Sequence, residues 1–480
     1  MQKILLFIAS LFYFNFLFSK NEIKSWQGIH ETPLSRLEQQ FAEPPVEFAN
    51  HVIWGWEGKM DKKTICNDLD SIKKKGFRAV IFEAGYKLPF KYLSEEWFKA
   101  IRTGVVEAKK RDMKVWIIDE GKYPSGFAGG KFSQERPDLR MQALVIGDTI
   151  QIKRGEVMTN HKIAPEIISA VAVSTSGAPN RTVEINNGKI SFNAGLDDWK
   201  ILLVKSDFRT AVTRAVNNPN GGKDATNSLC DYLNPVAVQQ FIDWTHKQYK
   251  KYLGKELGTT VLGFRGDEPD YAHLPWTPSI VQTFKDTKGY DPTPYLASFF
   301  TASPTIQEQR VKADYWDVWS SLFATHFFKL QADWCAANGV AHITHLNKEH
   351  EMPACVKAEG DYFRALSKVQ IPGVDAIWNQ IWPSTLNDFP KLASSVAHVY
   401  GKPRAFSESF AAYHISPTIP QAKFVVDHQI ARGINFFEFM FWLAGSKHRN
   451  WMSDPGMKGL NEYTNRTTYL MSQGKPGARI

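Results

Sequence analysis

Short apolar runs alternate with amphipathic segments along most of the chain, which is the pattern of β-strands that are each followed by a helix. Eight runs are expected to be strands, at 51–56, 77–85, 114–121, 261–270, 340–347, 375–382, 403–410 and 435–442. Helices are expected at 62–75, 95–111, 235–253, 306–338 and 420–432. Eight such units predict an α/β protein with a (β/α)8 TIM-like barrel. An open doubly wound sheet is the alternative, but no glycine-rich dinucleotide loop follows the first strand.

The alternation of strands and helices is interrupted between residues 139 and 227, where β-like runs are joined by Gly and Asn turns. This predicts a β-rich insertion after the third strand of the barrel, on the face that carries the active site in TIM barrels. The expected division is a signal peptide at 1–19, an arm at 20–50, the barrel at 51–138 and 228–460, the insertion at 139–227, and the start of a truncated C-terminal domain at 461–480.

The first twenty residues have the pattern of an export signal. Lys3 is followed by an apolar run over residues 4–18, and the small residue Ser19 is a suitable neighbour for a cleavage site. We therefore expect a secreted or periplasmic protein with no membrane span after cleavage, and an uncleaved anchor is the alternative. Fifteen apolar residues are short for a spanning helix.

The composition is that of a globular protein, with 43% hydrophobic and 22% charged residues among 480. The formal net charge of +9 would permit nucleic-acid binding, but the basic residues are scattered, so no nucleic-acid partner is expected. The four Cys form no C-x-x-C pair, which excludes a zinc ribbon or a thioredoxin-like motif. The chain has 15 Trp, 16 Tyr and 32 Phe, and flat rings suit sugar faces as well as a protein core.

In a TIM barrel, chemistry takes place where the C-terminal ends of the strands meet, an end called the mouth here. The expected strands bring many polar side chains to it: Glu83, Asp119, Glu120, Asp267, Glu268, Asp270, His342, His345, Asn379, Glu408 and Glu438. The chain has no G-x-S-x-G elbow, H-E-x-x-H motif or phosphate-binding loop. A mouth rich in carboxylates, with Trp residues nearby, indicates hydrolysis of glycosides and an oligo- or polysaccharide substrate.

Glycoside hydrolysis needs one carboxylic acid to protonate the leaving oxygen and a second carboxylate as nucleophile or as the base that activates water. Glu268 is the expected acid, because flanking carboxylates and burial would keep it protonated. Glu408, on the seventh strand, is the expected partner across the barrel. The alternative for each is a structural ion pair, for instance with Arg265 or Arg404.

Other residues at the mouth are expected to bind the substrate, namely Asp119, Glu120, Trp54, Asp267, His345, Asn379 and Trp382. Asp119 and Glu120 would bind sugar hydroxyls or a hard cation such as calcium. A tight turn with a solvated carboxylate is the alternative for them. The two His of the fifth strand are expected to face one side together, as ligands of sugar hydroxyls or as core residues.

The order of five motifs resembles that of the glycoside hydrolase family 106 α-L-rhamnosidases over about residues 41–474. The motifs are EPP at 43–45, DEGKYPSGFAGG at 119–130, GDEPD at 266–270, HLNKE at 345–349 and FSESF at 406–410. The resemblance implies a catalytic barrel with accessory β domains and inverting, calcium-dependent hydrolysis of terminal α-L-rhamnose in plant polysaccharides. It implies that Glu268 is the general acid and Glu408 the base, and Glu120 and Glu349 are the candidate calcium ligands.

The chain also departs from this pattern. Family members are usually longer, with β-sandwich domains after the barrel, and Lys122-Tyr123 stands where a Trp is expected. Three other readings stay open. They are a retaining exo-glycosidase of the TIM-barrel type, a carbohydrate-binding barrel without catalysis, and a metal-dependent hydrolase that uses Asp119, Glu120 and the two His as ligands.

Overall fold

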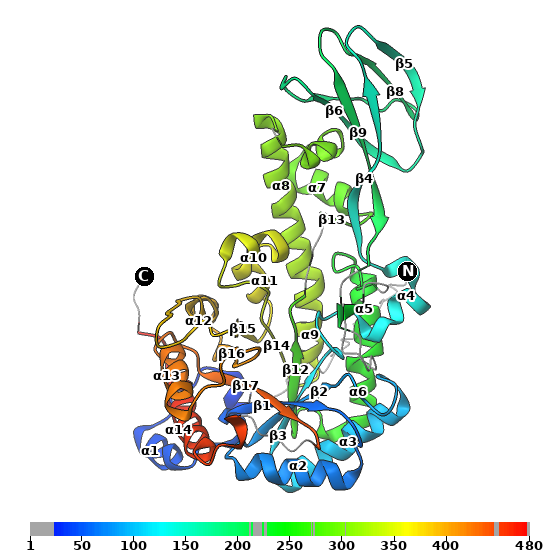
Figure 1. Cartoon of the computed structure of the whole chain (residues 1–480). Coiled ribbons are helices and arrows are strands. Elements are labelled where there is room, and N and C mark those ends of the chain that lie inside the picture. Colours follow the sequence, from blue (N-terminus) through cyan, green and yellow to red (C-terminus); the bar gives the residue numbers. More distant parts are fainter. Residues whose placement is uncertain are drawn as a thin grey trace, which may run out of the picture.

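Eight parallel strands close into a barrel, which confirms the expected (β/α)8 architecture (Figure 1). The order around the barrel is β1, β2, β3, β12, β14, β15, β16 and β17, and β17 pairs with β1. In that order the strands are His51–Trp56, Ala79–Ala84, Lys114–Ile118, Val261–Gly266, Ala341–Thr344, Ile371–Ala376, Phe406–Ser409 and Phe436–Leu443.

This structure is a computed structural model that describes residues 24–210, 213–214, 223–224, 228–269, 271, 274–302, 304–445 and 451–477. The expected signal peptide at 1–19, part of the region 139–227 and Asp270 lie outside the described residues. Among the helices described, none combines the length and the apolar character needed to cross a bilayer.

Helices lie between and after the strands, and side-chain caps mark where several of them begin. Asp61 accepts a hydrogen bond from the amide of Thr64, and Ser94 accepts one from the amide of Trp97. The helices are α1 Leu34–Ala42, α2 Lys62–Lys74, α3 Glu95–Lys110, α4 Lys131–Glu135, α5 Pro235–Trp244, α6 His246–Leu253, α7 Ile280–Lys288, α8 Ile306–Leu322, α9 Lys329–Ala337, α10 Met352–Glu359, α11 Tyr362–Leu366, α12 Pro390–Val399, α13 Ile419–Ile430 and α14 Met457–Met471. The segment expected as one helix at 306–338 comprises α8, a π-helical turn at Phe323–Phe328 and α9.

The barrel strands are apolar on both faces because each one separates two cores. Inward side chains form one cluster, which includes Ile53, Ile81, Trp116, Leu262, Ile343, Ile371, Phe406 and Phe436. Outward side chains such as Val52, Trp54 and Phe82 belong to the larger cluster under the helices. Two buried faces explain why the strands have continuous apolar runs rather than strict alternation.

Several strands are shorter than expected, and the differences at β15 and β12 affect the candidate site. β15 begins at Ile371 and ends at Ala376, whereas 375–382 was expected. The residues beyond it cannot continue the strand, because Trp378 and Asn379 have φ values of 58° and 56°. β12 ends at Gly266, and Glu268 has a φ of 37°, so the chain turns away from the barrel at its candidate acid.

Between β3 and β12, several strands form sheets outside the barrel. β13 joins the largest of these, a five-stranded sheet of order β13-β4-β9-β6-β7, in which every pair is antiparallel. β5 pairs with β8, and β10 pairs with β11. The strands are β4 Gln142–Ile152, β5 Val157–Lys162, β6 Ile167–Ser174, β7 Arg181–Thr182, β8 Lys189–Asn193, β9 Trp199–Phe208, β10 Thr213–Arg214, β11 Lys223–Asp224 and β13 Pro275–Trp276. A separate apolar cluster around Trp199 stabilises this region, which extends away from the barrel in Figure 1.

The last described helix, α14, packs on the barrel. It contacts α13 and α1, and its Tyr469 joins the inner barrel cluster. Asn461 and Asn465 on α14 accept hydrogen bonds from the side chain and the backbone amide of Asn50, just before β1. Residues 461–471 therefore belong to the helical layer of the barrel, rather than to a following domain as expected.

Candidate active site

The register of three neighbouring strands brings three carboxylates to one level of the mouth. Asp375 on β15 lies beside Glu408 on β16, which lies beside Glu438 on β17. Directly paired residues of parallel strands point to the same face, and all three side chains are buried. Glu408 and Glu438 were expected at the mouth from the sequence, whereas Asp375 was not, because the sixth strand was expected to begin at that residue.

Arg265 on β12 connects Glu408 and Glu438 with Asp267. Its guanidinium forms an ion pair with Asp267 at 2.7 Å, donates to Glu438 at 3.1 Å, and contacts the carboxylate of Glu408. Its Nη2 also lies 2.8 Å from Nε2 of His345, while Nδ1 of His345 donates to the carbonyl of Leu346. The side chain of Arg265 is fully buried. A planar guanidinium has donors for several acceptors at once, so one cation binds three carboxylates here.

Glu408 is ionised in this setting. Burial alone would raise the pKa of its carboxyl, but the charge of Arg265 and the hydrogen bond to His345 outweigh burial and lower it. Its Oε2 lies 3.3 Å from Nε2 of His345. The alternative raised from the sequence, an ion pair with Arg265, therefore exists, and it is also what keeps this carboxylate ready to accept a proton.

Glu268 has the opposite character. Burial, followed by the charge of Asp267, raises the pKa of the Glu268 carboxyl to about 7. Its side chain hydrogen-bonds with Asp375, whose pKa is raised well above its ordinary value by burial and by the charges of Glu408 and Glu268. The left-handed backbone of Glu268, with a φ of 37°, is uncommon for a side chain of this size and is typical of functional positions.

His345 lies between the two candidate catalytic carboxyls. Ligand atoms of Asp267, His345 and Glu408 lie within 4.8 Å of one another, and so do those of Glu268, His345 and Asp375. The structure therefore brings both members of the expected pair, Glu268 and Glu408, close to one imidazole.

The glycine-rich loop after β3 is organised by Glu120. One of its carboxylate oxygens accepts from the amides of Gly121 at 2.7 Å and Gly129 at 3.1 Å, and the other accepts from the amide of Ala128. Gly126 has a φ of 99°, and a Cβ there would lie 2.5 Å from the ring of Tyr232. Glu120 is therefore committed to the backbone of this loop.

Ser125 connects Asp119 to the residue that follows β12, Asp267. Asp119 accepts from the hydroxyl of Ser125 at 2.6 Å, and that oxygen accepts from the amide of Asp267 at 2.7 Å. The amide of Ser125 in turn donates to the carbonyl of Asp267 at 2.8 Å. Asp119 thus fixes the position of Asp267, next to the candidate acid.

A second buried ion pair lies at the mouth. Lys122 donates to Glu83 on β2 at 2.9 Å, and its ammonium lies 4.8 Å from the centre of the Tyr86 ring. Burial raises the pKa of Glu83, and the charge of Lys122 opposes that rise. Lys122, which departs from the family pattern, therefore has a structural role.

Three residues that were expected to bind the substrate, Trp54, Trp382 and Asn379, lie in different environments. Trp54 is wrong as a sugar platform, because it faces outward, is fully buried, and donates from Nε1 to Asp68 on α2 at 3.3 Å. Trp382 is half-buried in the loop after β15, against Tyr413. Asn379 accepts from the amide of His414 at 2.9 Å and so joins the loops after β15 and β16.

The two His of the fifth strand face opposite sides, which corrects the expectation that they act together. His345 points into the mouth, whereas His342 lies outside the strand wall near His246 and Cys335. A separation of three residues along a strand reverses the face of the side chain. A metal site made of Asp119, Glu120 and both His is therefore excluded by this geometry.

The candidate calcium ligands do not fit that cation. Calcium takes six to eight oxygen ligands, whereas both oxygens of Glu120 accept backbone amides. Oε1 of Glu349 accepts from the amide of Leu346 at 2.9 Å. Neither residue belongs to the clusters of metal-ligating atoms among the residues that the structure describes.

Comparison with known proteins identifies relatives of this chain. The family described as alpha-L-rhamnosidase, glycoside hydrolase 106, matches residues 156–480, which is more than half of the chain. A protein of Formosa agariphila described as "Putative beta-glucuronidase" is 23% identical over 93% of this chain. The chain spans 42% of the length of that relative.

The barrel and its outer sheets also resemble a solved structure. The rhamnosidase of Novosphingobium sp. PP1Y superposes with a TM-score of 0.69 at 15% identity, over 92% of this chain and 61% of that one. At this identity the likeness shows the fold. Because the family model matches more than half of the chain, the chain belongs to glycoside hydrolase family 106.

Proposed function

We propose that this chain hydrolyses the bond between a terminal α-L-rhamnose and the rest of a plant-type polysaccharide, oligosaccharide or glycoside. The observation that carries the proposal is the contrast between Glu268 and Glu408. Burial keeps the first carboxyl protonated near neutral pH, whereas Arg265 and His345 keep the second ionised. An acid and a base that work together need different pKa values, and these two carboxyl groups have them.

In the proposed reaction, Glu268 donates its proton to the glycosidic oxygen as the bond from that oxygen to the anomeric carbon breaks. Glu408 accepts a proton from a water molecule whose oxygen forms the new bond to the same carbon. The products are the aglycone alcohol and rhamnose of inverted configuration. Solvent then returns a proton to Glu268 and removes one from Glu408. In the retaining alternative, Glu408 itself would attack the anomeric carbon.

An uncharged sugar fits the charges at the mouth. A uronic acid carries a carboxylate that needs a free cation, whereas Arg265 and Lys122 are already paired with carboxylates. Arg265 and Lys122 are the buried cations of the mouth among the described residues. This supports a neutral sugar such as rhamnose over the glucuronic acid named in the description of the Formosa agariphila relative.

The test is a panel of α-L-rhamnosides and β-glucuronides, each with an activated aryl or an unactivated alkyl leaving group. Wild type should release rhamnose, and Glu268→Gln should lose about 10²–10⁴-fold on the alkyl rhamnoside and much less on the aryl one, because an activated leaving group needs little protonation. Glu408→Gln should lose activity on both. Turnover of the glucuronide alone would contradict the proposal that the sugar is rhamnose. Equal losses on both leaving groups would contradict the assignment of Glu268 as the acid. Nuclear magnetic resonance of the first released anomer separates inversion from retention.

Two further properties are proposed on sequence grounds alone. Calcium dependence follows from family membership, and no catalytic step is assigned to calcium here because the candidate ligands do not fit it. Assays with EDTA and with added calcium test it directly. Export to the periplasm or the medium follows from the apolar run at residues 4–18, and cell fractionation with the mass of the mature chain tests it.

A further inference from the structure

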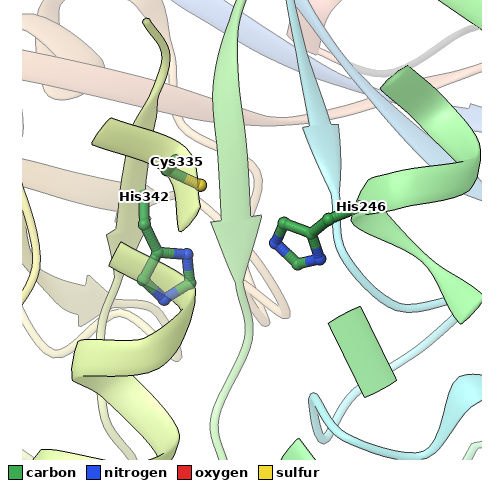
Figure 2. Close-up of side chains that lie close together, drawn as sticks. All are labelled: His246, Cys335 and His342. Atoms are coloured by element: carbon green, nitrogen blue, oxygen red, sulfur yellow. The ribbon is translucent and has the colours of Figure 1, made fainter. Parts of the chain in front are cut away.

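A buried cluster of His246, Cys335 and His342 lies outside the wall of the barrel, apart from the mouth. His246 begins α6, Cys335 belongs to α9 and His342 lies on β14. Figure 2 shows the two imidazoles and the thiol turned toward one another from these three elements. Their potential ligand atoms all lie within 4.8 Å of one another, and the three side chains are buried.

The hydrogen bonds around His246 leave one ring nitrogen free. The hydroxyl of Thr245 donates to the carbonyl of Phe241 at 2.7 Å, so its oxygen accepts from Nδ1 of His246 at 2.9 Å. Nδ1 therefore carries the proton, and Nε2 is a bare acceptor that has no hydrogen-bond partner although it is buried. Metal-binding His residues are commonly oriented in this way, by a hydrogen bond from the ring N–H that does not face the metal.

The other two side chains are available in the same way. Both ring nitrogens of His342 are buried without a hydrogen-bond partner, and Cys335 is a free thiol. Burial lowers the pKa of His342 to about 3 and that of His246 well below its ordinary value, so both rings are neutral. Neutral imidazoles can donate a lone pair, and leaving such polar atoms unpaired inside a protein costs free energy.

We propose that His246, Cys335 and His342 bind a zinc ion. The donor set of two imidazole nitrogens and one thiolate suits zinc and does not suit calcium or magnesium, which prefer oxygen. On binding, a bond forms between zinc and Sγ of Cys335, and the thiol proton leaves to solvent. The thiolate then cancels one of the two charges of the ion. Three protein ligands leave one position for water.

The position of the cluster indicates a structural role. A zinc ion there would join β14 to α6 and α9, which pack on the outside of the barrel. His345 follows on the same chain segment and faces the mouth, so the ion would stabilise the strand that presents His345 without contacting the substrate. Aromatic rings cover the cluster, with Phe264 and Trp334 at 4.3 and 5.3 Å from the ring of His246. Loading is therefore expected during folding.

The test uses the full chain, expressed with zinc in the medium and purified without a metal-affinity step. Elemental mass spectrometry should find about one zinc ion per folded wild-type chain. Cys335→Ser and His342→Phe should lower the zinc content at least about tenfold, because each removes one of three ligands. Expression with cobalt instead should give a thiolate-to-cobalt charge-transfer band in wild type that Cys335→Ser abolishes.

Two matched controls separate ligation from burial. Cys355→Ser removes another buried thiol, and His51→Phe removes another buried imidazole. Neither residue belongs to a cluster of ligating atoms within the described part of the chain. Both variants should keep the zinc and the cobalt band. Folded wild-type protein without zinc and without the band would overturn the proposal, even if no variant folds. So would an equal zinc content in the cluster variants and in wild type.

Discussion

Arg265 and Glu408 form a buried ion pair that joins β12 to β16 across the mouth of the barrel. The same guanidinium forms ion pairs with Asp267 and Glu438, and its charge lowers the pKa of Glu408. A buried charge without its partner is strongly unfavourable, which makes this cation a positioning residue for the proposed base.

Replacement of Arg265 by Lys should therefore change the pH dependence of turnover. An ammonium cannot contact three carboxylates in the same plane, so the pKa of Glu408 should rise. Since Glu408 must be ionised to accept a proton, the acidic limb of the pH–rate profile should move to higher pH, with kcat lower by about 10–100-fold at pH 5. The profile of kcat and KM against pH measures this.

Arg404→Lys is the matched control. Arg404 is equally buried, but it donates to the carbonyls of Glu47 and Asn435 and not to the carboxylates at the mouth. Its variant should lower the melting temperature and leave the acidic limb in place. An acidic limb that moves equally in both variants would show that Arg265 acts only through general stability.

The barrel could be predicted from the sequence because each unit has its own local signals. The expected first strand agrees with β1, and side-chain caps such as Asp61 and Ser94 mark the starts of helices. The candidate acid, base and His345 could be found because charged residues at the ends of apolar runs are unusual. Local pattern was sufficient for these features.

Other parts of the site depend on information that is not local. Trp54 was misassigned because a barrel strand is apolar on both faces, so its pattern does not distinguish inward from outward side chains. Asp375 was missed because its role comes from register with Glu408 on the next strand. The contacts of Arg265 with three carboxylates depend on the closure of the barrel, which brings distant segments together.

Trp54→Phe should lower stability and leave substrate binding unchanged. The substitution removes the hydrogen bond to Asp68 and leaves space in the outer core, at a cost of about 1–3 kcal/mol in the free energy of unfolding. Denaturant titration measures this cost, and KM for the rhamnoside should stay within about twofold because Trp54 faces away from the mouth. A KM that rises tenfold at unchanged stability would indicate that Trp54 binds the substrate after all.

Gly126→Ala should disturb the loop after β3. A methyl group at Gly126 would lie 2.5 Å from the ring of Tyr232, and the φ of 99° is unfavourable for Ala. We expect a loss of about 2–4 kcal/mol in the free energy of unfolding, with lower kcat, because the loop joins the end of β12 through Ser125.

Gly155→Ala is the control for that loop. Gly155 also has a positive φ, 79°, but no atom lies within 4 Å of its would-be Cβ. This variant should lose only about 1 kcal/mol and keep wild-type kcat. If both variants behave alike, backbone conformation rather than the close contact with Tyr232 limits the loop.

The pH profile of the Glu268→Gln variant tests the raised pKa of the proposed acid. A general acid must be protonated to act, so turnover of an alkyl rhamnoside by wild type should fall as pH rises through about 7, the pKa to which burial and Asp267 raise the carboxyl of Glu268. A carboxyl with an ordinary pKa near 4.3 would already be inactive there. In Glu268→Gln the basic limb should disappear, because the proposed proton donor has been removed. The residual rate should stay level from pH 6 to 9, whereas Asp119→Asn, which changes a residue that contacts Ser125, should keep the basic limb. A basic limb that persists in Glu268→Gln would mean that another group, such as the hydrogen-bonded Asp375, supplies the proton.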